Sequence, residues 1–200
     1  MENKATSIYI ESTPNPNTMK FVANYMLVQQ DFFHDFTSYT QTSGSPLAKL
    51  LFEKFSWVKE VFFSSNYITL TKKENVNWDE IQGAAREFIT KALSKGVEVG
   101  AMVPDVHDNE ANRLAEVPAK AEDGEIVAKI KGILDEYIRP AVEQDGGAIS
   151  FHSYDKGLVQ VVLQGSCSGC PSSTVTLKAG IETLLKRALP EIESVEAIEA

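Results

Sequence analysis

Residues 165–173 read Gly-Ser-Cys-Ser-Gly-Cys-Pro-Ser-Ser and contain both cysteines of this 200-residue chain. Two residues separate Cys167 from Cys170, so both sulfur atoms can bind one metal centre or form a disulfide with each other. A run rich in Val and Leu at 158–163 precedes them and predicts a strand. A helical pattern follows and begins at Pro171, because proline is favoured at the first helical position. We therefore predict that the cysteines lie in a strand-to-helix turn.

This predicted turn favours metal or anion binding. The first N–H groups of a helix have no partner inside the helix, and the helix dipole adds partial positive charge there. Both effects stabilise a thiolate, most strongly at Cys170. Ser168 and Gly169 between the cysteines are small, which lets backbone amides approach a bound anion or a cluster sulfide.

The nine-residue motif resembles the cluster-binding motif of the NifU C-terminal domain, found in the Nfu family of iron–sulfur carriers. Two flanking stretches, at 138–140 (Ile-Arg-Pro) and 145–147 (Asp-Gly-Gly), resemble the helix end and turn of the same family. Ala148 stands where many relatives have Asp or Asn. The resemblance covers roughly residues 125–198. Residues 12–21 in turn resemble the start of the separate N-terminal domain that often precedes the cluster domain in Nfu proteins.

The resemblance implies that Cys167 and Cys170 are cluster ligands and that Gly165, Gly169 and Pro171 shape the turn that binds the cofactor. A [4Fe–4S] cluster usually takes four thiolates, and one chain supplies two. We therefore expect a homodimer that shares one cluster, with a [2Fe–2S] form left open. The family's role implies a carrier and not an enzyme. Its partners would be an upstream assembly scaffold, which supplies the cluster, and apo iron–sulfur proteins, which receive it.

Other interpretations of the cysteine pair stay open. Buried cysteines often have only a packing role. A dithiol–disulfide oxidoreductase of the thioredoxin kind also has a strand, a C-x-x-C motif and a helix in that order. A zinc site would need about four ligands, and His152, which we expect to be exposed on a strand, is the one histidine of residues 125–200.

The charge distribution narrows the class of partner. The net charge is −9, with 10 Lys/Arg and 11 Asp/Glu in residues 1–100 and 9 and 17 in residues 101–200. An acidic surface argues against nucleic acid as a partner. No apolar run is long enough to cross a membrane. The first residues, 1–4, have neither an apolar signal core nor an arginine-rich presequence, so we expect a cytoplasmic protein.

We predict that residues 1–103 form an Nfu N-terminal-like domain. Alternation predicts strands at 7–11 and 18–22 and a hairpin of 58–63 with 67–71. Ser45 and Asn77 are expected to cap helices, and Gly96 to end the second one. The aromatic residues of 31–39 have helix-like spacing, 40–45 is expected to be a loop, and 97–103 a short closing strand.

Residues 104–124 are acidic and contain Pro118, which predicts a linker. Residues 125–200 then predict the NifU C-terminal-like cluster-binding domain. It has a helix from 125 that Pro140 ends or kinks, a hairpin of 149–154 with 158–163, a helix at 171–189 and an edge strand at 194–198. The fold class is therefore α+β, with two small domains that each pack helices on a short β-sheet, joined by the acidic linker.

Overall fold

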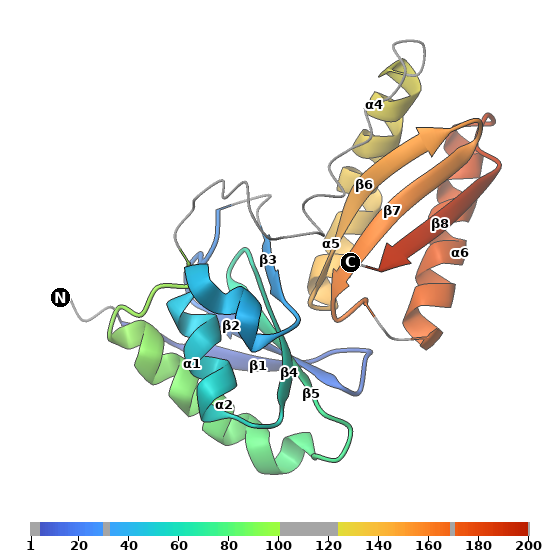
Figure 1. Ribbon diagram of the computed structural model, residues 1–200. Helices are drawn as coiled ribbons and strands as arrows, with labels where there is room; N and C mark the ends of the chain where they lie inside the picture. The colour runs from blue at the N-terminus through green and yellow to red at the C-terminus, as the bar shows by residue number, and fades with distance from the viewer. Residues whose placement is uncertain (1–4, 30–32, 101–123, 169–170, 200) are drawn as a thin grey trace. The chain divides into compact units, whose positions relative to one another are not determined.

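The structure is a computed structural model that describes residues 5–29, 33–100, 124–168 and 171–199 (Figure 1). The chain divides into two compact units, Met1–Asp108 and Asn109–Ala200. Each unit contains both helices and a β-sheet, so the predicted α+β class is confirmed. The expected linker at 104–124 lies outside the described residues, apart from Gly124. None of the helices in the described ranges is long and apolar enough to span a membrane.

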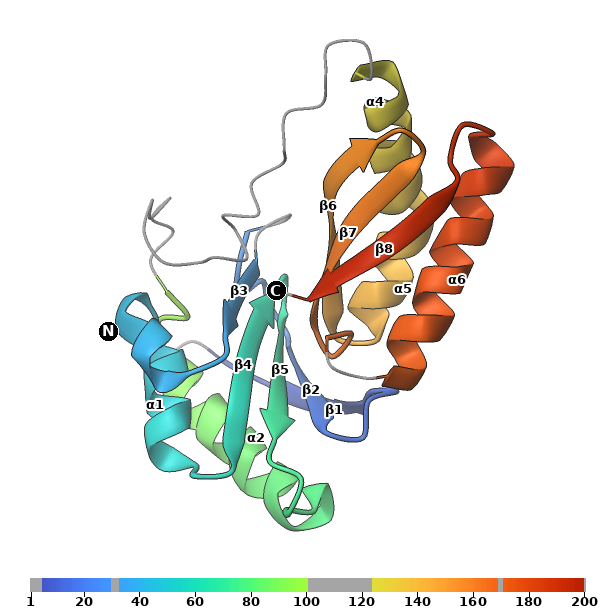
Figure 2. The same cartoon turned by 45° about the vertical axis from the view of Figure 1, so that its right-hand side comes forward.

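Unit 1 has a five-stranded antiparallel sheet in the order β1-β2-β5-β4-β3. Its strands are β1 (Ile8–Ser12), β2 (Thr18–Ala23), β3 (Phe33–Phe36), β4 (Val58–Ser64) and β5 (Tyr67–Lys72). Its helices are the 3₁₀ helix η1 (Tyr39–Gly44), α1 (Pro46–Lys54) and α2 (Trp78–Ser94). Buried side chains of α1 and α2 form one core with alternate residues of the strands, so both helices cover the same face of the sheet (Figure 2).

The helix ends of unit 1 follow the predicted local chemistry. The Ser45 hydroxyl accepts a hydrogen bond from the Ala48 N–H at 3.2 Å, and Pro46 is the first residue of α1. The Asn77 side chain accepts one from the Asp79 N–H at 3.2 Å at the start of α2. These oxygens pair N–H groups that the helix itself leaves unpaired. The predicted caps are therefore confirmed.

Three sequence predictions for unit 1 are wrong. The aromatic residues at 33–36 form the edge strand β3, although their spacing indicates a helix. A 3₁₀ helix occupies most of the predicted loop at 40–45. The described part of the expected closing strand, 97–100, is not a strand, and 101–103 lie outside the described residues. Strand β3 exists because β4 pairs with it across the sheet, and such long-range pairing leaves no local periodic signal.

Unit 2 has a three-stranded sheet in the order β6-β7-β8, in which β6 and β7 are antiparallel and β7 and β8 parallel. Its strands are β6 (Gly147–Asp155), β7 (Leu158–Gly165) and β8 (Ser194–Glu199). Its helices are α4 (Gly124–Ile133), the π-helical turn η3 (Leu134–Ile138), α5 (Arg139–Gln144) and α6 (Pro171–Ala188). Each of these helices and strands contributes at least one buried residue to a second apolar core.

Of the two outcomes predicted at Pro140, an end of the helix or a kink, the structure excludes the end. Pro140 does not end the helix: a π-helical turn leads directly into α5, and Pro140 lies in the first turn of that helix. A first-turn proline loses no intrahelical hydrogen bond, so the chain stays helical through 144. Tyr137, within the π turn, is 58% exposed, whereas Ile130 and Leu134 of the same helical stretch are buried. The extra residue of a π turn shifts the side chains that follow it, which moves Tyr137 off the buried face.

Candidate metal centre

Cys167 lies in the turn that follows β7, as the sequence predicts. The strand ends at Gly165, whose φ is +64°, and the Ser168 N–H donates a hydrogen bond to the Gly165 carbonyl at 3.2 Å. The Ser168 hydroxyl donates to the same carbonyl at 3.0 Å. The Cys167 side chain is 4% exposed and belongs to the core of unit 2. The core therefore holds this cysteine in place at the start of the turn.

Ser166 connects the cysteine turn by hydrogen bonds to the segment that follows α5. Its N–H donates to the Gly146 carbonyl at 3.3 Å, and its hydroxyl donates to the Asp145 carbonyl. The same hydroxyl oxygen lies 3.8 Å from the Cys167 sulfur. Two stretches that the sequence analysis singled out, 145–147 and 165–173, are therefore in contact. Sequence reasoning missed Ser166, because a serine inside the motif has no pattern that identifies its long-range partner.

The first residue of β6 also packs against Cys167. A Cβ atom on Gly147 would lie 2.8 Å from the Cys167 sulfur and 2.6 Å from the Gln164 carbonyl oxygen. Both separations are far shorter than a normal van der Waals contact of about 3.5–4.0 Å. Only glycine at position 147 allows the Cys167 sulfur to lie this close to the β6 backbone.

The other predicted site residues are only partly described. Gly169 and Cys170 lie outside the described residues, and Pro171 is the first residue of α6, as predicted. Among the residues that the structure describes, no group of three or more His, Cys, Asp and Glu side chains is placed to hold a metal ion. Cys167 can supply one soft thiolate ligand to a metal. Cys170 is the second thiol in the sequence.

His152 differs from its prediction. It was expected to be exposed, and its side chain is buried, with 9% of its surface accessible. A β-bulge between Phe151 and Ser153 interrupts the pairing of β6 with β7 at this residue. Because a bulge breaks the two-residue alternation, the sequence pattern does not predict the direction of the His152 side chain.

Comparison with known families assigns both halves of the chain. The family described as "Scaffold protein Nfu/NifU N terminal" matches residues 8–96. The family described as "NifU-like domain" matches residues 130–196, which include the cysteine motif. The two matches fall in units 1 and 2, respectively.

Curated relatives match over nearly the whole chain. A protein of Drosophila ananassae named "NFU1 iron-sulfur cluster scaffold homolog, mitochondrial" is 40% identical over 191 residues, which are 96% of this chain and 64% of the relative. The protein of the same name from Drosophila willistoni is 40% identical over 198 residues, 99% of this chain and 65% of the relative. This chain thus spans less than two thirds of the length of these relatives. A solution structure of a NifU-like protein from Saccharomyces cerevisiae is 24% identical, with a TM-score of 0.43, and the match covers 52% of this chain and 92% of that one.

These relatives correct the predicted location. They are named as mitochondrial proteins, which contradicts the expectation of a cytoplasmic one. That expectation rested on residues 1–4 alone. Because the relatives are longer than this chain, its first residues carry no information on a targeting segment.

Both domain families match in the expected order, and the similarity to the curated relatives spans both of them. The chain therefore belongs to the Nfu family, with an Nfu N-terminal domain followed by a NifU-like domain.

Proposed function

We propose that this chain is an iron–sulfur cluster scaffold, which holds a cluster for transfer and does not catalyse a reaction on it. The relatives that match 96–99% of the chain are named iron–sulfur cluster scaffold proteins. The NifU-like domain contains the cysteine pair, and soft thiolates are the ligands that iron–sulfur clusters take.

The ligands in this proposal are Cys167 and Cys170. The observation that carries it is the position of Cys167, in a turn between β7 and α6 that Ser166 ties to the Asp145 carbonyl. This turn keeps the sulfur at the end of a strand and in front of a helix start, where N–H groups favour negative charge. Following the family resemblance, we propose that Gly165, Gly169 and Pro171 are the other residues of the cluster-binding motif.

The number of thiols leads us to propose a shared cluster. A [4Fe–4S] cluster usually takes four thiolates and this chain has two cysteines, so two chains together complete the set. The cluster-bound form is then a homodimer, and a [2Fe–2S] cluster in the same four-thiolate site is the second form to test. When the two chains separate, the cluster loses the two thiolates of one chain. A shared site therefore suits delivery to apo-proteins after loading by an upstream assembly scaffold.

Anaerobic reconstitution tests the proposal. Full-length protein treated with iron and sulfide is expected to turn brown, to bind one cluster per two chains and to sediment as a dimer. Cys167→Ser and Cys170→Ser each remove two ligands from the symmetric site, one per chain, and each is expected to lose the cluster, since serine is a harder and less acidic ligand. Thr183→Ala, an exposed change on α6, is the control that keeps it.

Two results would contradict this function. A colourless protein whose two cysteines cycle reversibly between dithiol and disulfide would indicate the dithiol–disulfide oxidoreductase. A monomer that holds four irons without added small thiols would refute the shared site. Circular dichroism of each variant separates loss of the cluster from loss of the fold.

A further inference from the structure

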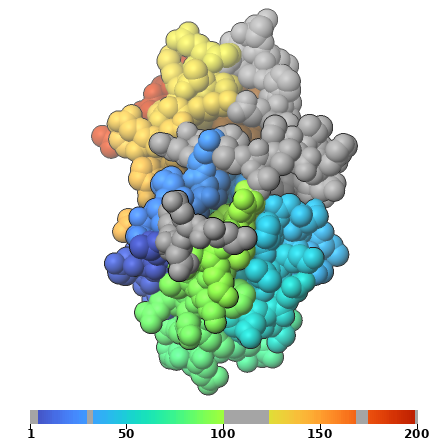
Figure 3. Space-filling model, turned by 90° about the vertical axis from the view of Figure 1, so that its left-hand side faces the viewer, coloured from blue at the N-terminus to red at the C-terminus, as the bar shows by residue number. Residues whose placement is uncertain are grey.

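A groove on unit 1 lies between α1 and α2, far along the chain from the cysteine motif. Its volume is about 320 Å³, and its lining residues are Leu50, Lys54, Phe88, Lys91, Ala92, Lys95 and Val97. On the face shown in Figure 3, α1 and α2 lie side by side. A pocket of this size is at the lower limit for a whole small-molecule ligand, and it suits a few apolar side chains of a larger partner.

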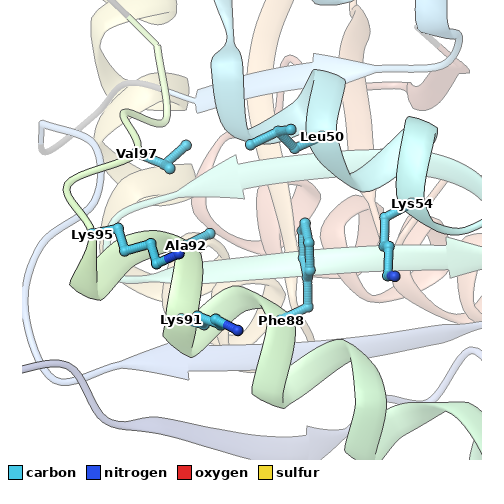
Figure 4. A pocket seen from close by; sticks show the side chains of 7 residues that line it. All are labelled: Leu50, Lys54, Phe88, Lys91, Ala92, Lys95 and Val97. Carbon is cyan, nitrogen blue, oxygen red and sulfur yellow. The ribbon is translucent and has the colours of Figure 1, made fainter.

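The floor of the groove is apolar. Phe88 points from α2 toward Leu50 of α1, with Ala92 and Val97 beside them (Figure 4). Leu50 is 36% exposed, although Leu51 next to it is fully buried in the core. A second aromatic ring, Phe55, supports Phe88 from the core side, with ring centroids 5.4 Å apart. The floor of the groove is therefore a solvent-exposed apolar surface that packs on the core of unit 1.

The end of the groove near Val97 is held by the cap of α2. The Gly96 N–H donates to the Leu93 carbonyl at 3.0 Å, and the Val97 N–H donates to the Ala92 carbonyl at 3.1 Å. With Gly96 at a φ of +76°, this is the Schellman motif, in which the residue after the glycine packs on the last helical turn. The next residues are tied to α1, because the Leu47 N–H donates to the Glu98 carbonyl at 3.1 Å. The groove is therefore formed before any partner binds.

Three lysines surround this apolar floor. Lys54 lies at one end, Lys95 at the other, and Lys91 along the α2 side (Figure 4). No ion pair joins any of the three to another residue in the described part of the chain. The rim is thus locally positive in a chain whose net charge is −9.

We propose that this groove binds an amphipathic, acidic segment of a partner protein, whose apolar side chains contact Leu50 and Phe88 and whose carboxylates pair with Lys54, Lys91 and Lys95. A short helix in an apolar groove buries side chains at i, i+3 or i+4 and i+7, and acidic residues beside them meet the lysines. An anionic membrane is the less favourable partner, since a groove of this size between two helices suits a few side chains and not a flat lipid surface. This binding site is separate from the cluster site and does not depend on it.

A labelled model peptide tests the proposal on the full-length chain. The probe is a fluorescent helical peptide about four turns long, with leucines along one face and glutamates on both sides of them. We expect binding by fluorescence anisotropy, with an affinity that falls as salt is added. A peptide of the same leucine pattern with lysines in place of the glutamates is expected to bind at least about tenfold more weakly, since like charges repel.

Variants of the groove locate the binding. The double variant Lys54→Glu/Lys91→Glu is expected to weaken binding of the acidic peptide at least about tenfold and to strengthen binding of the basic peptide, because the rim changes sign. Leu50→Ser is expected to weaken both peptides. Lys49→Glu is the control: it makes the charge change of one of the two groove substitutions at an exposed position of α1 outside the groove, and binding is expected to stay within about twofold.

Three results would overturn the proposal. They are equal binding of both peptides to the wild-type chain, equal losses in the Lys49→Glu and groove variants, and stronger binding of the wild-type chain to vesicles of anionic phospholipid than to the acidic peptide. Chemical shifts of amides in α1 and α2 on titration with the peptide provide an independent check, because a peptide that binds elsewhere leaves them unchanged.

Discussion

Gly147 and Cys167 come closer together than any side chain at position 147 would allow. A Cβ atom at this position would lie 2.8 Å from the Cys167 sulfur and 2.6 Å from the Gln164 carbonyl oxygen. The second of these atoms belongs to the backbone of β7 and cannot rotate away. A methyl group at 147 must therefore displace the cysteine, separate the ends of β6 and β7, or both.

We predict that Gly147→Ala destabilises unit 2 by about 1–3 kcal/mol, the usual cost of overpacking a core. Because the displaced atom is a proposed ligand, the folded variant is also expected to hold less iron per chain after anaerobic reconstitution. Urea unfolding and an iron count on the folded fraction measure the two effects separately.

Gly180→Ala is the matched control for this change. It lies in α6 of the same unit, and a Cβ there meets nothing within 4 Å. Alanine in a helix is about 0.5–1 kcal/mol more favourable than glycine, so this variant is expected to be at least as stable as the wild type and to keep its iron. Loss of iron in both variants, or in neither, would show that Gly147 has no special role beside Cys167.

The part of the cysteine site that could be predicted from the sequence is the part that neighbouring residues determine. The C-x-x-C spacing and Pro171 predict a strand, a turn and a helix, and β7 and α6 are found there. The contact of Ser166 with the Asp145 carbonyl joins residues 21 positions apart, and no periodicity in the sequence encodes it.

Among the helices and strands, the best predicted are those whose ends carry a recognisable capping or turn residue. Ser45 and Asn77 identify the starts of α1 and α2, and Lys156-Gly157, both at positive φ, closes the β6–β7 hairpin as the predicted turn requires. Strand β3 was missed because its stability comes from pairing with β4 and not from its own pattern. At Pro140 the sequence left an end or a kink of the helix open, because no sequence pattern identifies the π turn that changes the register just before the proline.

Glu182 connects two elements of unit 2 whose ends are far apart in the chain. Its carboxylate accepts a hydrogen bond from the Lys186 ammonium on α6 and one from the Val195 N–H of β8 at 3.1 Å. The bond to Lys186 first, and then the bond to the Val195 N–H, hold the pKa of the Glu182 carboxyl below its ordinary value. Folding therefore favours the ionised form of this group.

We predict that Glu182→Gln lowers the urea midpoint of unit 2 near neutral pH and that the difference from the wild type shrinks in acid. A carboxyl whose pKa is lowered by folding stabilises the protein fully above its ordinary pKa of about 4.3, and this contribution is lost as the pH falls through the lower, folded-state pKa. Urea unfolding followed by the Val195 amide resonance at neutral pH and near pH 3 measures this change.

Glu143→Gln provides the comparison for Glu182. Glu143 lies in α5 and forms no ion pair with another residue in the described ranges. Its substitution is expected to change the midpoint little at either pH. A constant loss of stability for Glu182→Gln at both pH values would mean that packing, and not the carboxylate charge, holds α6 to β8.

On the scale of the whole molecule, the residues that the structure describes form two apolar cores that share no residue. One includes Phe21, Leu51 and Ile89, and the other includes Ile130, Leu163 and Ile181. Two such cores were predictable from two sets of amphipathic elements separated by an acidic stretch. The strand orders were not: β2 pairs with β5 across two helices and two strands, and no sequence signal specifies that neighbour.

The division into residues 1–103 and 125–200 predicts that the two cores unfold independently. Both tryptophans, Trp57 and Trp78, lie in the core region of unit 1, with ring centroids 5.6 Å apart, so tryptophan fluorescence reports on that unit alone. The amide resonance of Val161, in β7, reports on unit 2. One urea titration of the full-length chain thus follows each core separately.

We predict that Ile181→Ala, at a fully buried position of α6, lowers the free energy of unfolding of unit 2 by about 2–5 kcal/mol and leaves the tryptophan midpoint unchanged. Leu51→Ala, equally buried in α1, is expected to do the reverse: it should shift the tryptophan midpoint and leave the Val161 resonance unaffected. The two variants remove side chains of similar size, so each is the control for the other. If either variant moved both transitions together, the chain would unfold as one cooperative body, and the proposed boundary between two independent domains would be wrong.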